Sequence, residues 1–302
     1  MRKIGMGMAM VSTALAGALM LAGCGGAPSA NGSSHDSPDG AEMQLVTNGV
    51  LTVGTSAEYE PFEYMQDGEY KGFDLDLARA IAEDLDLELK IENVDFDTIV
   101  PGVASGAKYD VGIAAITATP EREDQVDFTE SYYLDDQAIV TMADNAEVTG
   151  DTCFDVLNAD GVKIAVQSGS TAEAFARENF PKASLVPFKN ATDCFAAVQS
   201  NQAVALVTNR SVAAQLVATS FTNEHVIKQV STGEEYAIAV GKANPALREA
   251  LDASIEKLAA NGTIDALMAQ YNIKSVALGS CGLGRPGPHD GGMLGARRIS
   301  AG

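Results

Sequence analysis

Short apolar segments alternate with amphipathic segments between about residues 50 and 271. Over residues 74–85, apolar side chains recur every three to four positions, which is the spacing of one helix face. Leu87, Leu89 and Ile91 instead alternate with charged residues, as in a half-buried strand. The chain therefore combines helical and strand periodicities in regular succession.

The alternation predicts parallel α/β sheets that are covered by helices. The expected strands are 51–55, 87–91, 110–115, 138–140, 162–166, 204–207 and 236–240. The expected helices are 74–85, 98–104, 121–125, 170–179, 191–200, 211–218, 245–260 and 263–271, with an extended segment at 126–133. Such a chain is long enough for two α/β lobes. Because open α/β sheets bind ligands at the carboxyl ends of their strands, two facing lobes would share one cleft.

The N-terminal residues have the pattern of an export signal. Arg2 and Lys3 precede a run of apolar and small residues, 4–22, which ends in the sequence LAGC at Cys24. This sequence is the lipobox pattern of bacterial lipoproteins and predicts a signal peptide over 1–23, cleaved before an acylated cysteine. The alternative is an uncleaved N-terminal anchor. Either interpretation places the body outside the cytoplasm, attached to the cell membrane.

Two further segments lack any apolar period. Residues 24–44 are rich in Gly, Ser, Pro and Asn, which is typical of a flexible tether. Residues 276–302 are rich in Gly, Pro and Arg and are expected to be a disordered tail, which contains Cys281.

Cys153 and Cys194 both open amphipathic helical patterns in the middle of the chain. Outside the cytoplasm a disulfide between them is chemically permitted, and it is the interpretation we favour. The alternative is two buried free thiols.

The net charge of the chain limits the kinds of molecule that the protein can bind. The chain has 41 Asp and Glu against 20 Lys and Arg, a formal net charge of −21. This balance argues against nucleic-acid binding, which needs a basic face. It does not exclude a local binding site for an anion, because a positively charged site can occur on a protein whose net charge is negative. We expect no cofactor and no metal, since no metal-ligand spacing occurs.

Four stretches carry the candidate chemistry. They are GTSAEYEPFE at 54–63, GFDLDLA at 72–78, IAAITATPER at 113–122 continuing into VDFTESYY at 126–133, and VQSGSTAE at 166–173. In order and spacing they closely resemble the extracellular solute-binding proteins of polar amino-acid ABC importers. The resemblance spans roughly residues 45–275. It implies a type II periplasmic-binding-protein-like fold, with two α/β lobes joined by a two-strand hinge.

Arg122 is the main candidate for an anion contact. Thr119 can cap a short helix that has Pro120 at its first position, and a cation in the first turn opposes the helix dipole. A bound carboxylate would relieve this, and a guanidinium grips a carboxylate with two hydrogen bonds. The alternative is a surface salt bridge with Glu121 or Asp127.

The resemblance also implies a set of ligand-binding residues. Thr117, Arg122, Ser170 and Thr171 should hold an α-carboxylate, and Ala115 should offer a backbone group to the α-amino end. The full expected set is Ser56, Tyr59, Phe96, Ala115, Thr117, Arg122, Gln167, Ser170, Thr171 and Asn209. For Phe96, ordinary core packing is an equal alternative. Asp74 is left out of the set, because we expect it to cap the helix that follows Gly72.

One position departs from the family pattern. Asn209 stands where these proteins usually carry an Asp that receives the ligand ammonium, and Arg210 follows it. An amide oxygen still accepts a hydrogen bond, but the ion pair is lost. We therefore expect a pocket that is less selective for a cationic group, in which Arg210 favours an acidic or amide-bearing side chain.

The resemblance implies lobe 1 at 45–136 and 234–275 and lobe 2 at 137–233, with crossings near 133–139 and 231–236. A monomer would close on a polar amino acid and deliver it to a membrane permease with its ATPase. The chain has no P-loop, so it cannot drive transport alone. The alternatives are a cyclohexadienyl-dehydratase-like enzyme on the same fold, or a ligand-sensing module for a membrane receptor.

Overall fold

The computed structural model describes residues 43–273. The predicted signal peptide, the lipid site Cys24, most of the tether 24–44 and the tail 276–302 with Cys281 lie outside the described residues. Among residues 43–273, no helix has the length and apolar character needed to cross a membrane.

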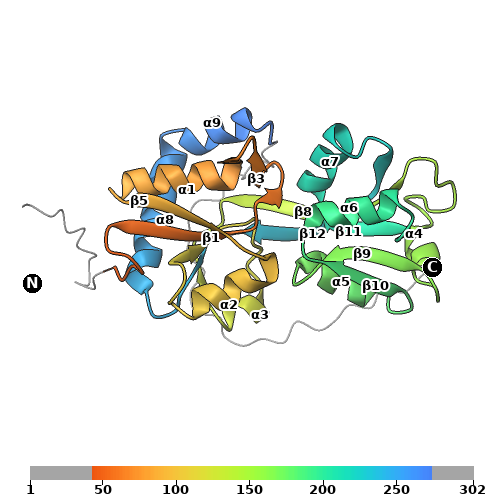
Figure 1. Ribbon diagram of the computed structural model, residues 1–302, viewed down its shortest axis with the longest axis horizontal. Helices are drawn as coiled ribbons and strands as arrows, with labels where there is room; N and C mark the ends of the chain where they lie inside the picture. The colour runs from red at the N-terminus through yellow and green to blue at the C-terminus, as the bar shows by residue number, and fades with distance from the viewer. Residues whose placement is uncertain (1–42, 274–302) are drawn as a thin grey trace, which may run out of the picture. The chain divides into compact units, whose positions relative to one another are not determined.

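Lobe 1 is built on a five-stranded sheet with the order β5-β1-β6-β13-β7. Its strands are β1 Val50–Thr55, β5 Glu88–Asn93, β6 Val111–Gly112, β7 Asp127–Phe128 and β13 Ala239–Val240. β5, β1 and β6 are parallel, whereas β13 pairs antiparallel with both β6 and β7. Figure 1 shows this sheet between helices on both of its sides.

Lobe 2 repeats the plan with the order β10-β9-β11-β8-β12. Its strands are β8 Tyr133–Met142, β9 Lys163–Gln167, β10 Ser184–Phe188, β11 Ala205–Asn209 and β12 Glu224–Tyr236. β10, β9 and β11 are parallel, and β8 is antiparallel to both β11 and β12. The prediction of parallel sheets is therefore correct for three strands of each lobe and wrong for the strands that connect the lobes.

The expected helices are present with small shifts at their ends. They are α1 Phe73–Asp84, α2 Ile99–Ala104, α3 Pro120–Glu123, α5 Thr171–Asn179, α6 Ala191–Gln199, α7 Arg210–Thr219, α8 Pro245–Ala260 and α9 Thr263–Gln270. A short helix α4 Cys153–Leu157, at the helical pattern that opens at Cys153, and a 3-10 turn η1 at Phe96–Thr98 were not among the expected ranges. α1 shows why the periodicity was informative. Its Phe73, Leu77 and Ile81 are fully buried and form one apolar face.

A small antiparallel sheet of β2 Glu58–Tyr59, β3 Glu63–Gln66 and β4 Glu69–Lys71 was not predicted. Its strands are too short to produce a clear period. It links β1 to α1 and places Tyr59 in the space between the lobes.

The chain crosses between the lobes twice, as predicted. It passes from β7 in the first sheet to β8 in the second, and it returns from β12 to β13. β8 and β12 run side by side through the middle of Figure 1, and Tyr133 is the register partner of Tyr236. Both rings pack on Phe62 of lobe 1, with centroids 5.1 and 5.3 Å away. The crossing is thus fixed by aromatic packing on the lobe 1 side.

The predicted disulfide is wrong. Cys153 and Cys194 are both free and buried. Cys153 belongs to a core cluster with Ile164 and Val166 of β9, whereas Cys194 packs in the cluster that contains Ala165. Because neighbouring residues of a strand point to opposite faces, the sheet of lobe 2 separates the two thiols.

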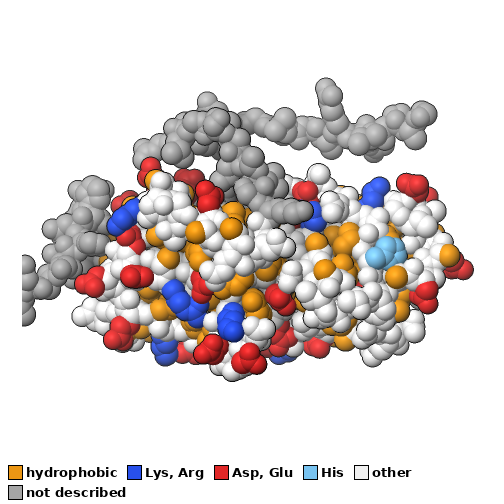
Figure 2. Space-filling model, turned by 90° about the horizontal axis from the view of Figure 1, so that it is seen from above, with side chains coloured by type: hydrophobic (Ala, Val, Ile, Leu, Met, Phe, Trp, Pro, Cys, Tyr) orange, Lys and Arg blue, Asp and Glu red, His pale blue; other side chains and the backbone are white. Residues whose placement is uncertain are grey.

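Acidic side chains are spread over the face drawn in Figure 2, with fewer basic ones between them. That face has no continuous basic surface of the kind that binds a phosphate backbone.

Candidate functional site

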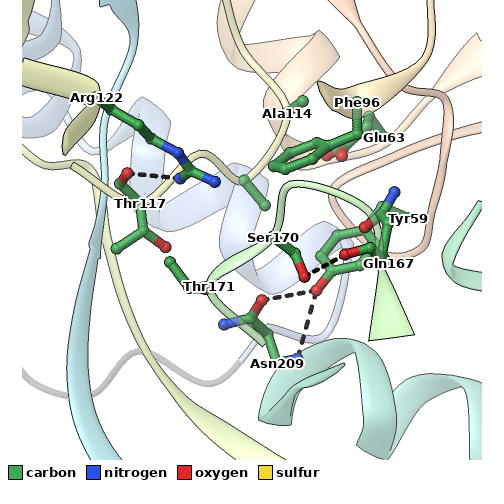
Figure 3. Close-up of a pocket in the computed structure, with 11 residues that line it drawn as sticks. Tyr59, Glu63, Phe96, Ala114, Thr117, Arg122, Gln167, Ser170, Thr171 and Asn209 are labelled. Atoms are coloured by element: carbon green, nitrogen blue, oxygen red, sulfur yellow. Dashed lines mark hydrogen bonds between the residues drawn. The ribbon is translucent and has the colours of Figure 1, made fainter. Parts of the chain in front are cut away.

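A small pocket lies between the two lobes (Figure 3). It is lined by Tyr59, Glu63, Phe96, Ala114, Ala115, Thr117 and Arg122 from lobe 1, and by Gln167, Ser170, Thr171 and Asn209 from lobe 2. Its volume is about 10 Å³, room for about one water molecule, because side chains of both lobes meet across it. A larger ligand would enter only if the lobes separated.

The structure brings together all the residues of the expected set except Ser56. Ser56 is buried, and its carbonyl accepts a hydrogen bond from the Glu58 amide that shapes the turn after β1. Glu63 and Ala114 line the pocket but were not selected from the sequence. Glu63 follows the core residue Phe62, and Ala114 precedes the selected residue Ala115. Nothing in the sequence pattern marked Glu63 or Ala114 as a residue of the pocket.

Arg122 is held by the turn that leads into α3. Thr119 Oγ1 accepts a hydrogen bond from the Arg122 amide, and Pro120 is the first helical residue, which confirms the predicted cap. The guanidinium donates from Nη1 to the Thr117 carbonyl at 2.7 Å and from Nη2 to the Gly169 carbonyl of lobe 2 at 3.0 Å. It also lies over the ring of Phe96, 5.5 Å from the centroid.

Arg122 makes no ion pair with any carboxylate that the structure describes. The alternative of a surface salt bridge is therefore excluded, and Asp127 pairs instead with Lys242 Nζ at 3.2 Å. Burial lowers the pKa of Arg122, and the more distant charges of Glu234 and Glu121 oppose that shift. The guanidinium is thus a half-buried cation satisfied by carbonyl oxygens, and a carboxylate would be a stronger acceptor for it.

Lobe 2 faces Arg122 with the turn between β9 and α5. Ser170 caps α5, since its Oγ accepts from the Glu173 amide at 3.1 Å. The same hydroxyl donates to the Gln167 carbonyl at 2.7 Å. Gly169 has φ +73°, a left-handed conformation that glycine adopts without strain. This turn places the side chain of Thr171 at the pocket (Figure 3).

Tyr59 and Asn209 join the lobes through side chains. The Tyr59 hydroxyl donates to Asn209 Oδ1 at 2.7 Å and lies 3.2 Å from Thr208 Oγ1. Burial raises the pKa of Tyr59, so the hydroxyl remains a donor at neutral pH. At the rim, Gln215 Nε2 donates to Glu60 Oε1 at 2.9 Å. These contacts hold the lobes together around the pocket.

Glu234 of β12 is a buried carboxylate that the sequence analysis missed. It is 6% exposed, and its Oε2 accepts from Thr117 Oγ1 at 2.6 Å, Thr171 Oγ1 at 2.8 Å and Asn209 Nδ2 at 3.0 Å. Gln137 Nε2 donates to Oε1. Three of these donors line the pocket, so Glu234 stands directly behind its wall. Thr232 Oγ1, two positions away, is a more distant donor at 3.5 Å. The other four partners are 25 to 117 positions away in sequence, and no local pattern signals such contacts.

Asp74 does not cap α1, contrary to the prediction. The N-cap is Gly72, and Asp74 is fully buried inside the helix start. Its Oδ2 accepts from the Ala115 amide at 2.7 Å and from the Tyr132 hydroxyl at 2.8 Å, and burial raises the pKa of Asp74 to about 7. Ala115 has φ +47°, so Asp74 fixes an unusual backbone conformation in the pocket wall. Because its amide is engaged, only the carbonyl of Ala115 could meet an ammonium group.

Arg210 does not line the pocket. Its Nε lies 3.4 Å from Oδ1 of Asp135, whose side chain is fully buried in β8. Burial raises the pKa of Asp135, and Arg210 opposes that shift. The expected role of Arg210 beside a ligand side chain is not supported by this position.

Known proteins share this architecture. The profile of the bacterial extracellular solute-binding proteins, family 3, matches residues 51–274. The chain belongs to this family. The resemblance stated from the sequence motifs is confirmed, and so is the two-lobed α/β fold of type II periplasmic binding proteins.

Individual members of family 3 agree with this assignment. The ABC transporter glutamine-binding protein GlnH of Bacillus subtilis (strain 168) is 28% identical over 277 residues, which cover 90% of this chain and 97% of that protein. The solved structure of an ancestral arginine-binding protein bound to glutamine has a TM-score of 0.70 and 33% identity, and the match covers 76% of this chain and all of that one.

An enzyme is also among the relatives. Cyclohexadienyl dehydratase of Pseudomonas aeruginosa is 28% identical over 167 residues, which cover 55% of this chain and 61% of the enzyme. Family 3 membership alone therefore does not separate binding from catalysis, although the relatives matched over most of their length are binding proteins.

Proposed function

We propose that this protein is the substrate-binding component of an ABC importer and captures a polar amino acid between its lobes. The observation that carries the proposal is Arg122, a half-buried cation in the interlobe pocket without an anionic partner among the described residues. Membership of family 3 and the amino-acid-binding relatives support the same ligand class.

In the proposed complex, the guanidinium of Arg122 exchanges its two carbonyl acceptors for the ligand α-carboxylate. Thr117, Ser170 and Thr171 add hydroxyl and amide donors to that carboxylate. Tyr59 and Phe96 cover the ligand side chain from lobe 1, and Gln167 contacts it from lobe 2. All these residues already line one pocket, which supports a shared role.

Ligand capture would follow from closure of the lobes about β8 and β12. A ligand that contacts Arg122 and Thr171 together binds the closed state better than the open one, and this difference drives closure. The closed, loaded protein would then dock on a membrane permease with its ATPase. We further propose that the protein acts as a monomer outside the cytoplasm, held at the membrane by acylated Cys24.

A thermal-shift screen of the protein against the standard amino acids tests the ligand class. We expect the unfolding midpoint to rise with at least one polar amino acid. Calorimetry on Arg122→Ala should then show affinity lowered by about a hundredfold or more. The matched control is Arg177→Ala, since Arg177 is exposed and forms its ion pair with Glu173 on the same helix, α5. Equal affinity of Arg122→Ala and the wild type would overturn the proposed site.

A second candidate function is a dehydratase of a cyclic amino-acid precursor. Glu63 favours it, because burial raises the pKa of this pocket-lining carboxyl well above its usual range and a protonated carboxyl is a general acid. The test is incubation of the protein with cyclohexadienyl substrates and NMR analysis of the mixture. Release of every ligand unchanged would exclude catalysis, whereas an aromatic product would replace the importer proposal.

A further inference from the structure

The interlobe site contains two opposite charges that do not pair with each other. Arg122 donates to two backbone carbonyls, and Glu234 accepts from three pocket-lining side chains, from Gln137 and from Thr232. Neither residue forms an ion pair within the part of the chain that the structure describes. Since buried charges are costly without a partner of opposite sign, the site retains one cationic and one anionic position.

The other carboxyl groups near the pocket are less suited to receive a cation. Burial and the neighbouring charge of Asp74 raise the pKa of Glu63 well above its usual range, which favours the neutral acid. Asp135 is already paired with Arg210. Glu234 is therefore the carboxylate at the pocket whose hydrogen-bond partners are all uncharged.

We propose that Glu234 supplies the negative charge that binds the ammonium group of a zwitterionic amino acid, and that this ammonium displaces the neutral Asn209 amide from the Glu234 carboxylate. The proposal deepens the proposed function and rests on it. Arg122 would take the α-carboxylate of the same ligand. Two opposite charges on different sides of one pocket complement a zwitterion better than they complement an acid or an amine alone.

The hydrogen bonds around Glu234 allow an ammonium group to replace one of its neutral donors. The Asn209 amide donates to Oε2 through Nδ2, and an ammonium group entering at that position would replace a neutral donor by a charged one. The hydroxyls of Thr117 and Thr171 can rotate away from Glu234 and donate to the ligand carboxylate instead. The neutral donors that hold Glu234 now would thus become ligand contacts.

The position of Glu234 in β12 links the ligand to the crossing between the lobes. The pairing of β12 with β8 shifts register between Val230 and Glu234, immediately before this residue. Thr117 of lobe 1 and Thr171 of lobe 2 both donate to it. A ligand that binds Glu234 therefore contacts β12, one of the two strands that connect the lobes.

The test is calorimetry with the amino acid that binds the wild type most tightly in the screen and with its deamino analogue, which lacks only the ammonium group. Glu234→Gln should lower affinity for the amino acid by about thirtyfold or more. It should leave affinity for the analogue within about threefold, because the analogue has no charge to lose. Asn209→Asp combined with Glu234→Gln returns a carboxylate 3.0 Å from the original one and should restore most of the affinity.

Glu235→Gln is the matched control, since Glu235 is the exposed neighbour on the same strand. Equal losses for the amino acid and its analogue, or no loss for either, would overturn the role of Glu234. If Glu234→Gln does not fold, a crystal structure of the wild type with the same amino acid decides. An ammonium nitrogen within about 3.2 Å of the Glu234 carboxylate supports the proposal, and contact with Asn209 alone overturns it. Failure of the wild type to bind any amino acid would instead refute the proposed function.

Discussion

The hydroxyl of Tyr59 in lobe 1 donates a 2.7 Å hydrogen bond to Oδ1 of Asn209 in lobe 2. Both side chains are at least nine-tenths buried, so this bond crosses the pocket away from water. Asn209 Nδ2 in turn donates to Glu234, which places one amide between a donor of lobe 1 and the carboxylate of β12. The closed arrangement therefore depends on an amide at position 209, which can accept from one side and donate to the other.

Tyr59→Phe removes this bond and leaves Asn209 Oδ1 without its donor. Because an unsatisfied buried acceptor costs about 1–3 kcal/mol, ligand affinity should fall about tenfold. Calorimetry measures the affinity, and small-angle scattering should show a larger radius in the presence of ligand. Tyr64→Phe is the control, since the Tyr64 hydroxyl makes none of the hydrogen bonds that the structure describes. Affinity unchanged within about twofold would contradict the bridging role.

Gly169→Ala should weaken closure. A Cβ at Gly169 would lie 2.9 Å from Cβ of Asp97 in lobe 1, and the φ of +73° would strain an alanine. Gly161→Ala is a matched control, because its φ is +84° but nothing lies within 4 Å of the added Cβ. Both substitutions should lower the free energy of unfolding by about 1 kcal/mol. We expect only Gly169→Ala to lower ligand affinity, by about tenfold in calorimetry. Equal affinities of the two variants would contradict a steric clash between residue 169 and Asp97 in the closed state.

Asp74 should make the folded state less stable as pH rises. Its pKa is about 7 in the folded protein against an ordinary 3.8, so the unfolded chain releases this proton first. The contribution of Asp74 to the free energy of unfolding is fully present below pH 3.8. It declines by ~4 kcal/mol up to about pH 7 and is constant above that pH. Urea unfolding at several pH values measures this trend. Asp74→Asn should reduce the pH dependence of the free energy of unfolding, whereas the same substitution at the exposed residue Asp160 should not. An unchanged pH dependence in Asp74→Asn would show that other groups cause it.

The two free thiols predict that reductant has no effect on stability. The thermal unfolding midpoint should be the same with and without dithiothreitol. Cys153→Ala and Cys194→Ala should each cost about 1–2 kcal/mol through lost packing. Because the thiols belong to separate core clusters, the double variant should equal the sum within about 0.5 kcal/mol. A midpoint that falls by several degrees on reduction would show that a disulfide forms after all.

The helices, the longer strands and the local geometry of the site follow from short-range patterns in the sequence. The period of α1, the cap at Thr119 with Pro120, and the cap at Ser170 depend on residues within a few positions of one another. Such interactions are visible in a linear pattern, which is why the cap before Arg122 and the helix that begins near Thr171 were predicted.

Which distant groups meet depends instead on the packing of the whole fold. Asp74 bonds Ala115 across 41 positions, and Glu234 bonds Thr117 across 117. The sheet of lobe 2 places Cys153 and Cys194 on opposite faces, although both have the same local pattern. The burial of a charge and the identity of its partner depend on how the two lobes and their crossing strands pack. That packing sums many contacts between segments far apart in the chain, and no single segment encodes it.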